Sequence, residues 1–158
     1  MPRTLQPVPR WAVWASWILS FVGLALAIYL TYEHFSQKVF QGCGGLGSTF
    51  NCQKVTTSAQ SRFLGVPVAV LGLANFVIFV VINSPWVWKV RYYGIHLARF
   101  VLTLGGMAFV LWLLYAELFI IGNLCLYCTG VHVVTFALFV VLVRVCPAQL
   151  GWASSASE

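Results

Sequence analysis

Four long apolar stretches dominate this sequence, and each is close to the length that a membrane-spanning helix needs. A helix crosses a hydrocarbon core of about 30 Å with roughly 20 apolar residues. Hydrophobic residues make up 61% of the chain and charged residues only 8%, which is too few charges to cover a water-soluble domain of 158 residues. We therefore predict an all-α integral membrane protein, a bundle of four transmembrane helices over residues 11–32, 65–83, 95–121 and 124–145.

The connection between the first two helices, residues 33–64, is the only sizeable polar segment. We find no internal repeat and no low-complexity tail, so residues 1–158 are predicted to form a single membrane domain. The first apolar stretch could be read as a signal peptide, but it continues past Ala25-Leu26-Ala27 and exceeds the 7–15 apolar residues typical of such a segment. We expect it to be retained as a helix.

The net charge of +6 is explained by membrane topology. With the N-terminus in the cytoplasm, six basic residues lie on the cytoplasmic side and three on the other, a positive-inside bias that places both termini in the cytoplasm. The lipid bilayer is then the expected partner, and no basic stripe is left to suggest nucleic acid. The cytoplasmic set is Arg3, Arg10, Lys89, Arg91, Arg99 and Arg144, and the opposite set is Lys38, Lys54 and Arg62.

Four of the five cysteines form two pairs that this topology places together on the non-cytoplasmic side. Cys43 and Cys52, the loop pair, lie in a glycine-rich part of the long loop, and Cys125 and Cys128, the inner pair, form a Cys-x-x-Cys motif where the fourth helix begins. Disulfides form and persist outside the cytoplasm, so the charges and the cysteines agree independently. Cys146 lies near the cytoplasmic end, and we predict an unpaired thiol without a role.

The position of the inner pair predicts redox chemistry. We expect Asn123 to cap the fourth helix, which puts Cys125 in its first turn and Cys128 one turn deeper. The N-terminus of a helix stabilises a thiolate, and the i, i+3 spacing puts both sulfurs on one face, where they can form a reversible disulfide. Cys128, the deeper thiol, would meet a lipid-soluble oxidant, and Cys125 would be open to attack by a loop cysteine.

Other uses of four cysteines fit less well. Cys43 and Cys52 are too far apart for the usual spacing of zinc ligands, so no metal site is predicted. Two purely structural disulfides remain an alternative, which would make the chain a non-enzymatic membrane protein. A Cys-x-x-Cys disulfide closes only a small loop, however, and is usually strained and easily reduced.

The order of these elements resembles the vitamin K epoxide reductase family. The shared features are a loop cysteine pair after the first helix, a serine six residues beyond its second cysteine, and a Cys-x-x-Cys motif opening the last of four helices. The segment from Cys52 to Ser58 and the Phe63-Leu64-Gly65-Val66-Pro67 sequence are similar to bacterial members. A DsbB-type quinone oxidase has the same ingredients, but there the Cys-x-x-Cys motif precedes the loop pair.

The resemblance implies a bundle that surrounds a quinone beneath a loop carrying shuttle cysteines. By this likeness Cys43 and Cys52 are the shuttle pair, Cys125 and Cys128 are the active-site pair, and Ser58 lies beside the centre. The implied activity is a quinone-dependent thiol oxidase in the bacterial inner membrane, which uses menaquinone or ubiquinone and supports oxidative protein folding. Bacterial members often carry a fused thioredoxin-like domain that this sequence does not contain, so a separate thioredoxin-like or DsbA-like partner is implied.

The likeness has two departures, and both concern the quinone side. Animal members have a tyrosine one turn after the second active-site cysteine, where this sequence has His132, and an asparagine near the start of the second helix, which is absent between Gly65 and Gly72. These differences favour quinone reduction over the alternative of vitamin K epoxide reduction. His132 is predicted to hydrogen-bond the quinone, because an ionisable residue inside a membrane is a functional candidate. We expect Glu117 to be solvated and Arg99 to reach toward the cytoplasmic surface.

Overall fold

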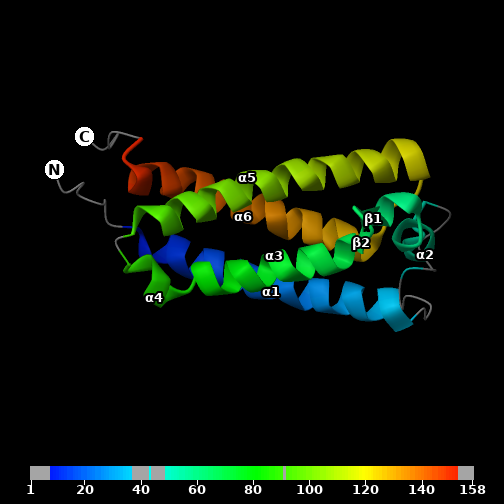
Figure 1. Cartoon of the computed structure of the whole chain (residues 1–158), viewed down its shortest axis with the longest axis horizontal. Coiled ribbons are helices and arrows are strands. Elements are labelled where there is room, and N and C mark those ends of the chain that lie inside the picture. The colour runs from blue at the N-terminus through cyan, green and yellow to red at the C-terminus, as the bar shows by residue number, and fades with distance from the viewer. Residues whose placement is uncertain (1–7, 37–42, 44–48, 91, 153–158) are drawn as a thin grey trace.

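Long helices running side by side form the molecule (Figure 1). The structure, a computed structural model, describes residues 8–36, 43, 49–90 and 92–152. Helix α1 packs against both α3 and α6, α6 also packs along α5, and α3 and α5 touch each other less. These helices are α1 (Arg10–Ser36), α3 (Val68–Ile82), α5 (Tyr93–Tyr115) and α6 (Leu126–Leu150), and a π-helical segment, η2 (Ala116–Ile121), continues α5.

Three helical segments are long and apolar enough to cross a membrane: Arg10–Ser36, Tyr93–Ile121 and Leu126–Leu150. The fourth predicted span corresponds to α3, which has only 15 residues. The mostly helical architecture with candidate membrane-spanning helices is therefore observed, and the count of four transmembrane helices stays a prediction. Residues 37–42 and 44–48 of the predicted loop lie outside the described residues.

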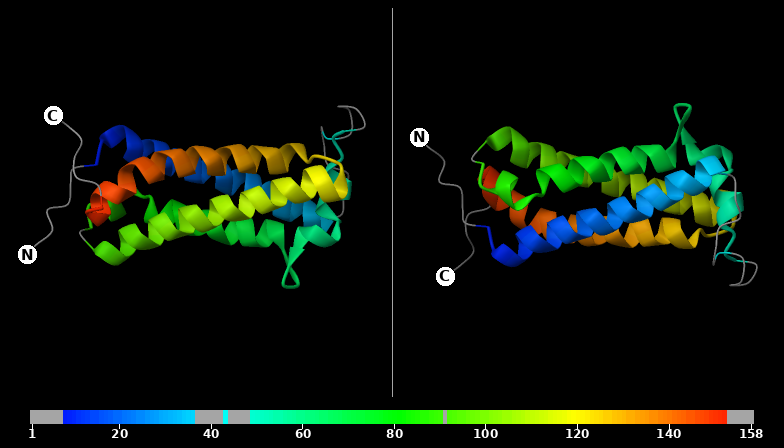
Figure 2. Two further views of the ribbon diagram at one scale, coloured as in Figure 1. Left: turned by 90° about the horizontal axis from the view of Figure 1, so that it is seen from above. Right: turned by 90° about the horizontal axis from the view of Figure 1, so that it is seen from below.

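Helix α3 is shorter than predicted because a β-hairpin occupies the start of the expected span. Strands β1 (Arg62–Phe63) and β2 (Val66–Pro67) pair antiparallel, with Phe63 opposite Val66. Leu64 and Gly65 both have positive φ, 50° and 84°, as a tight two-residue hairpin turn requires. The hairpin projects from the side of the bundle, and Leu64 at its tip is 90% exposed (Figure 2).

Close packing joins α1 to α3. Gly23 of α1 faces the ring of Phe76, and a Cβ atom at this position would overlap that ring. Polar bonds reinforce the contact, since Thr31 Oγ1 donates to the carbonyl oxygen of Ala69 at 3.2 Å and Asn83 Nδ2 donates to Ser20 Oγ at 3.1 Å. These two bonds lie at opposite ends of α3 and fix its position along α1.

A buried arginine closes the end of the bundle where α1 begins. Arg99 is fully buried, contrary to the prediction that it reaches the surface. Its guanidinium stacks 3.6 Å from the centre of the Trp88 ring, in the short helix α4 (Pro85–Trp88), and donates to the carbonyl oxygen of Ile82 and to His96 Nδ1. A cation is favourable beside the C-terminal carbonyls of a helix, so Arg99 holds the end of α3 against α5. Cys146 is a free thiol buried near this end.

The paired cysteines all lie at the other end of the bundle. The short helix α2 (Cys52–Thr56), the 3-10 turn η1 (Ala59–Ser61) and the start of α6 meet there (Figure 1). The start of α1 and the end of α6 lie at the end closed by Arg99. The prediction that the two cysteine pairs share one end is confirmed, although the membrane side they face stays a prediction.

Candidate redox site

The loop pair and the inner pair lie in one buried cluster. Cys43 and Cys52 form a disulfide, with their Cα atoms 6.0 Å apart. Cys43, Cys52 and Cys125 are all nearly or fully inaccessible, and they pack with Leu30 and Val55. Cys128 packs against the same cluster. Residues from α1, the loop, α2 and α6 thus bring together four sulfur atoms that are as much as 85 residues apart in sequence.

Backbone hydrogen bonds attach the redox loop to the segment that precedes α6. The N–H of Asn51 donates to the carbonyl oxygen of Leu124 at 3.0 Å, and the N–H of Leu124 donates to that of Thr49 at 2.9 Å. The result is an isolated parallel bridge between Phe50 and Leu124. In this parallel register Asn51 is opposite Cys125, so Cys52, the next residue, is brought close to Cys125, and the two pack in the same cluster.

A side-chain contact adds to this bridge. Lys54 Nζ, on α2, donates to Asn123 Oδ1 at 2.7 Å, and Asn123 Nδ2 donates to the carbonyl oxygen of Thr49 at 3.5 Å. The prediction that Asn123 caps α6 is therefore wrong. Its amide joins the redox loop to the start of α6 instead.

Cys125 itself is the N-cap of α6. Its Sγ accepts the backbone N–H of Cys128 at 3.3 Å, and its backbone is extended, as at an ordinary cap. Cys125 is thus one position outside the helix, and Cys128 lies in the first turn rather than one turn deeper. Cys125 packs with the loop cysteines and Cys128 faces a cavity, as predicted, but the predicted order of depth is wrong, because Cys125 is fully buried and Cys128 is partly exposed.

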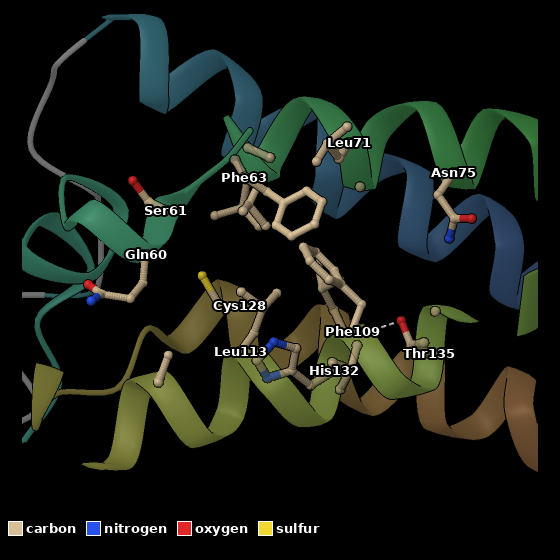
Figure 3. Close-up of a pocket in the computed structure, with 18 of the residues that line it drawn as sticks. Gln60, Ser61, Phe63, Leu71, Asn75, Phe109, Leu113, Cys128, His132 and Thr135 are labelled. Carbon is tan, nitrogen blue, oxygen red and sulfur yellow. Dashed lines mark hydrogen bonds between the residues drawn. The ribbon is translucent and has the colours of Figure 1, made fainter. Parts of the chain in front are cut away.

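That cavity has a volume of about 680 Å³ and is lined by residues of α1, α2, the hairpin, α3, α5, η2 and α6. Phe63 of the hairpin and Phe109 of α5 meet edge to face within it, their ring centroids 5.6 Å apart. Cys128 and His132 project into it from α6, and Leu71 and Asn75 lie across from them on α3 (Figure 3). Most of the lining is aliphatic or aromatic, with few polar groups, which is typical of sites for small organic molecules.

His132 is the most distinctive of those polar groups. It is only 8% exposed, and its Nδ1 has no hydrogen-bond partner among the described residues. An unpaired buried nitrogen is costly, so an acceptor or donor on a bound molecule would satisfy it. The structure thus places His132 in the cavity, as its prediction as a quinone-binding residue requires. Its contact with a quinone stays a prediction.

Ser58 also lines the cavity. It precedes η1, and its Oγ donates to the carbonyl oxygen of Val55 at 2.7 Å. The hydroxyl hydrogen is therefore engaged in holding the end of α2. An acceptor lone pair remains, so Ser58 can offer a bound molecule a hydrogen-bond acceptor.

Glu117 lies in the site, and the prediction that it is solvated is wrong. It is 4% exposed, lines the cavity, and accepts the backbone N–H of Cys125 through Oε2 at a long 3.5 Å. The π-helical turn of η2 carries it, and Gly122 ends that turn with a φ of 66°. Such turns occur often at functional sites.

Sequence reasoning missed three residues of the cavity: Asn75, Phe109 and Glu117. Asn75 lies three residues beyond the interval searched for the family asparagine, and a search of the whole second helix would have found it. Phe109 is one of many aromatic residues and carries no local signal. Glu117 does carry one, because only three residues of the chain are acidic.

A comparison with known families agrees with this arrangement. Residues 14–143 match the Vitamin K epoxide reductase family, a span that includes most of α1, both cysteine pairs, the cavity and most of α6. That family implies an oxidoreductase that links quinones and disulfides. Together with its apolar helices, the match makes this chain a membrane protein, and it belongs to the vitamin K epoxide reductase family.

Proposed function

We propose that this protein is a quinone-dependent thiol oxidase that regenerates disulfides in a thioredoxin-like or DsbA-like partner. The observation that carries the proposal is the position of Cys128. It packs against the buried cluster that holds Cys43, Cys52 and Cys125, and it also lines the cavity. Electrons that arrive as thiols at the loop therefore have a route of adjacent sulfurs to the cavity.

The cavity suits a quinone as the electron acceptor. A volume of about 680 Å³ lies within the range of roughly 300–1,000 Å³ found for small-molecule sites. The facing rings of Phe63 and Phe109 can pack on a quinone ring, and His132 and Asn75 can bond its oxygens. The lining favours no choice between menaquinone and ubiquinone.

The relay has two thiol–disulfide exchanges followed by one reduction. A reduced partner attacks the Cys43–Cys52 disulfide and leaves oxidised, which frees the Cys52 thiolate. Cys52 then attacks Cys125 in the Cys125–Cys128 disulfide and releases Cys128 as a thiolate at the cavity. The two protons lost by the partner's thiols are taken up by Cys128 and, once it is freed, by Cys125. When Cys43 resolves the Cys52–Cys125 bond, the loop pair is closed and the inner pair is reduced, which is the pairing present in the structure. The inner pair then returns to a disulfide as it passes two electrons to the quinone.

Membrane sidedness follows from the same proposal. The cysteine end faces the non-cytoplasmic side of a bacterial inner membrane, where a DsbA-like partner would be found and where disulfides persist. The end closed by Arg99, with both termini, faces the cytoplasm. The excess of basic residues at that end supports this orientation.

Trapping the mixed disulfide tests the relay directly. In the Cys43→Ala, Cys128→Ala double variant, neither resolving thiol is present, so Cys52 and Cys125 should accumulate as a disulfide that non-reducing peptide mass spectrometry detects. The control is Cys43→Ala, Cys128→Ala, Cys146→Ala, which should give the same bond. If the bond does not form under oxidising conditions, the loop pair does not pass electrons to the inner pair.

A second measurement separates an enzyme from a protein with structural disulfides. The purified protein is reduced, mixed with a short-chain quinone, and its thiols are alkylated for mass analysis. An oxidase closes its disulfides and produces hydroquinone in equal amount. Thiols that stay open with quinone present would exclude quinone-dependent oxidation.

A further inference from the structure

Two buried carboxylates flank the cysteines, although the chain is almost without acidic residues. The sequence contains only three, and the two within the described part, Glu33 and Glu117, are both buried at the cysteine end. A carboxylate inside a membrane is costly unless it has a partner or a role. Among the described residues, neither glutamate forms an ion pair with a basic side chain; Glu33 hydrogen-bonds Tyr29, and Glu117 accepts the backbone N–H of Cys125.

Only Glu117 faces the reacting atoms. It lines the cavity beside Cys128, it is near enough to Cys128 Sγ to interact electrostatically, and its Oε2 accepts the N–H of Cys125. Glu33 lies on α1 outside the cavity lining. The π-helical turn that holds Glu117 ends within four residues of Cys125, which fixes the carboxylate against the inner pair.

We propose that Glu117 is the proton-transfer residue that carries a thiol proton from the inner pair to the acceptor in the cavity. This inference rests on the proposed quinone reduction. Formation of the Cys125–Cys128 disulfide removes two electrons and two protons from the thiols, and a quinone needs both pairs to become a hydroquinone. Glu117 takes one proton as the S–S bond forms and gives it to the nearer quinone oxygen, so it ends as the carboxylate it was. His132, one turn below Cys128, is placed to pass on the second proton.

Glutamine at position 117 separates this role from a structural one. The side chain of Glu117→Gln keeps an oxygen that can accept the Cys125 N–H, but it cannot carry a proton. General acid–base groups contribute about 100- to 10,000-fold to enzyme rates, so turnover should fall at least about 100-fold, while KM for the quinone changes by less than about threefold. Glu117→Asp should recover part of the rate, because it restores a carboxylate one bond shorter.

Glu117→Gln should make alkylation of Cys128 faster, although it makes turnover slower. The negative charge of Glu117 opposes a second negative charge on Cys128 Sγ, and thiolates are the species that N-ethylmaleimide attacks. In full-length protein with Cys43, Cys52, Cys125 and Cys146 replaced by alanine, Glu117→Gln should therefore speed alkylation of Cys128 by at least about threefold. A misfolded site would also expose Cys128 and speed its alkylation, so the thermal unfolding midpoint of each variant is measured as well: it should be unchanged in Glu117→Gln, whereas misfolding would lower it.

Turnover is measured for the wild type, Glu117→Gln, Glu117→Asp and the matched control Glu33→Gln. Alkylation of Cys128 is measured at the same pH for the same four forms in the background that lacks the other four cysteines. Slower turnover with faster alkylation in Glu117→Gln alone is the expected result. Unchanged turnover in Glu117→Gln, slower alkylation, or an equal loss in Glu33→Gln would each overturn the proton role of Glu117. If the wild type itself reduces no quinone, the proposed function fails and this inference fails with it.

Discussion

At the scale of single residues, His132 determines how the cavity can recognise its ligand. Tyrosine at this position would present a hydroxyl that both donates and accepts. Neutral histidine presents one donor and one acceptor on opposite sides of a ring, and Nδ1 has no partner in the part of the chain that the structure describes. A quinone carbonyl oxygen is an acceptor, so we expect it to bond an N–H on this ring.

Replacing His132 with alanine should therefore weaken quinone binding. A lost hydrogen bond of about 1.4 kcal/mol corresponds to a tenfold rise in KM for the quinone, and loss of proton transfer should also lower turnover. Steady-state quinone reduction with a saturating dithiol measures both. The matched control is the adjacent Val133→Ala, because Val133 is 62% exposed on the outer face of α6. Unchanged kinetics in His132→Ala would remove His132 from the quinone site.

At the scale of elements, two short connections hold the redox loop in register with α6. The backbone bridge between Phe50 and Leu124 sets the register, and the bond from Lys54 to Asn123 holds the far side of α2. These two contacts hold the loop pair against Cys125, although the two segments are about 70 residues apart in the sequence. Exchange between Cys52 and Cys125 is fast when their encounter is so restricted.

We expect Lys54→Met and Asn123→Ala each to slow formation of the Cys52–Cys125 bond by about three- to tenfold, as loss of a hydrogen bond of roughly 0.5–1.5 kcal/mol implies. The rate is followed by quenched alkylation in the Cys43→Ala, Cys128→Ala background. Because both changes remove the same bond, the double variant should be no slower than the slower single variant. Lys89→Met, at the opposite end of the bundle, is the control. Additive effects would show that the two side chains act independently.

The sequence predicted the helices better than it predicted the ends of the helices. Long apolar runs identify α1, α5 and α6, because burial in lipid requires little beyond hydrophobicity. The hairpin before α3 was hidden, since Phe63, Leu64 and Val66 are as apolar as the helix that follows and only the positive φ of Leu64 and Gly65 separates them. Asn123 is a good cap by residue type, but contacts with Lys54 and Thr49, some 70 residues away, decide its place.

The site was predicted to the extent that it depends on spacing. The four cysteines were found from their pattern and position along the helices, and His132 from its distance to Cys128. Glu117 and Arg99 were misplaced because a charged residue near a helix end usually reaches water. Whether it is buried instead depends on distant partners such as Cys125 or Ile82, which local sequence does not reveal.

At the scale of the whole molecule, the bundle has two chemically different ends. One end has the two cysteine pairs and the buried Glu33 and Glu117, and the other has the start of α1, the end of α6 and the buried Arg99. In a membrane the two ends of the bundle would face different compartments. The proposed orientation puts the sulfur chemistry outside the cytoplasm.

Cysteine labelling in intact bacteria tests that orientation. In a variant whose five native cysteines are replaced by serine, Thr57→Cys at the end of α2 should react with a membrane-impermeant maleimide from outside. Lys89→Cys, exposed at the other end, should react only after the cells are permeabilised. The reverse pattern would place the redox site in the cytoplasm and contradict the proposed partner.

Helix α3 is shorter than the thickness of a membrane, whereas the neighbouring helices are long enough to cross one. Its 15 residues give a length of about 22 Å, against a hydrocarbon thickness of about 30 Å. As a membrane crossing, α3 would have a hydrophobic mismatch of about 8 Å, which lipids relieve by thinning at a cost of fractions of a kcal/mol per Å. The first half of α3 and the adjoining hairpin form one wall of the cavity. The bilayer would thus be thinnest beside the cavity. A ligand that diffuses within the hydrocarbon core would then have a shorter distance to cover along the membrane normal to reach Cys128.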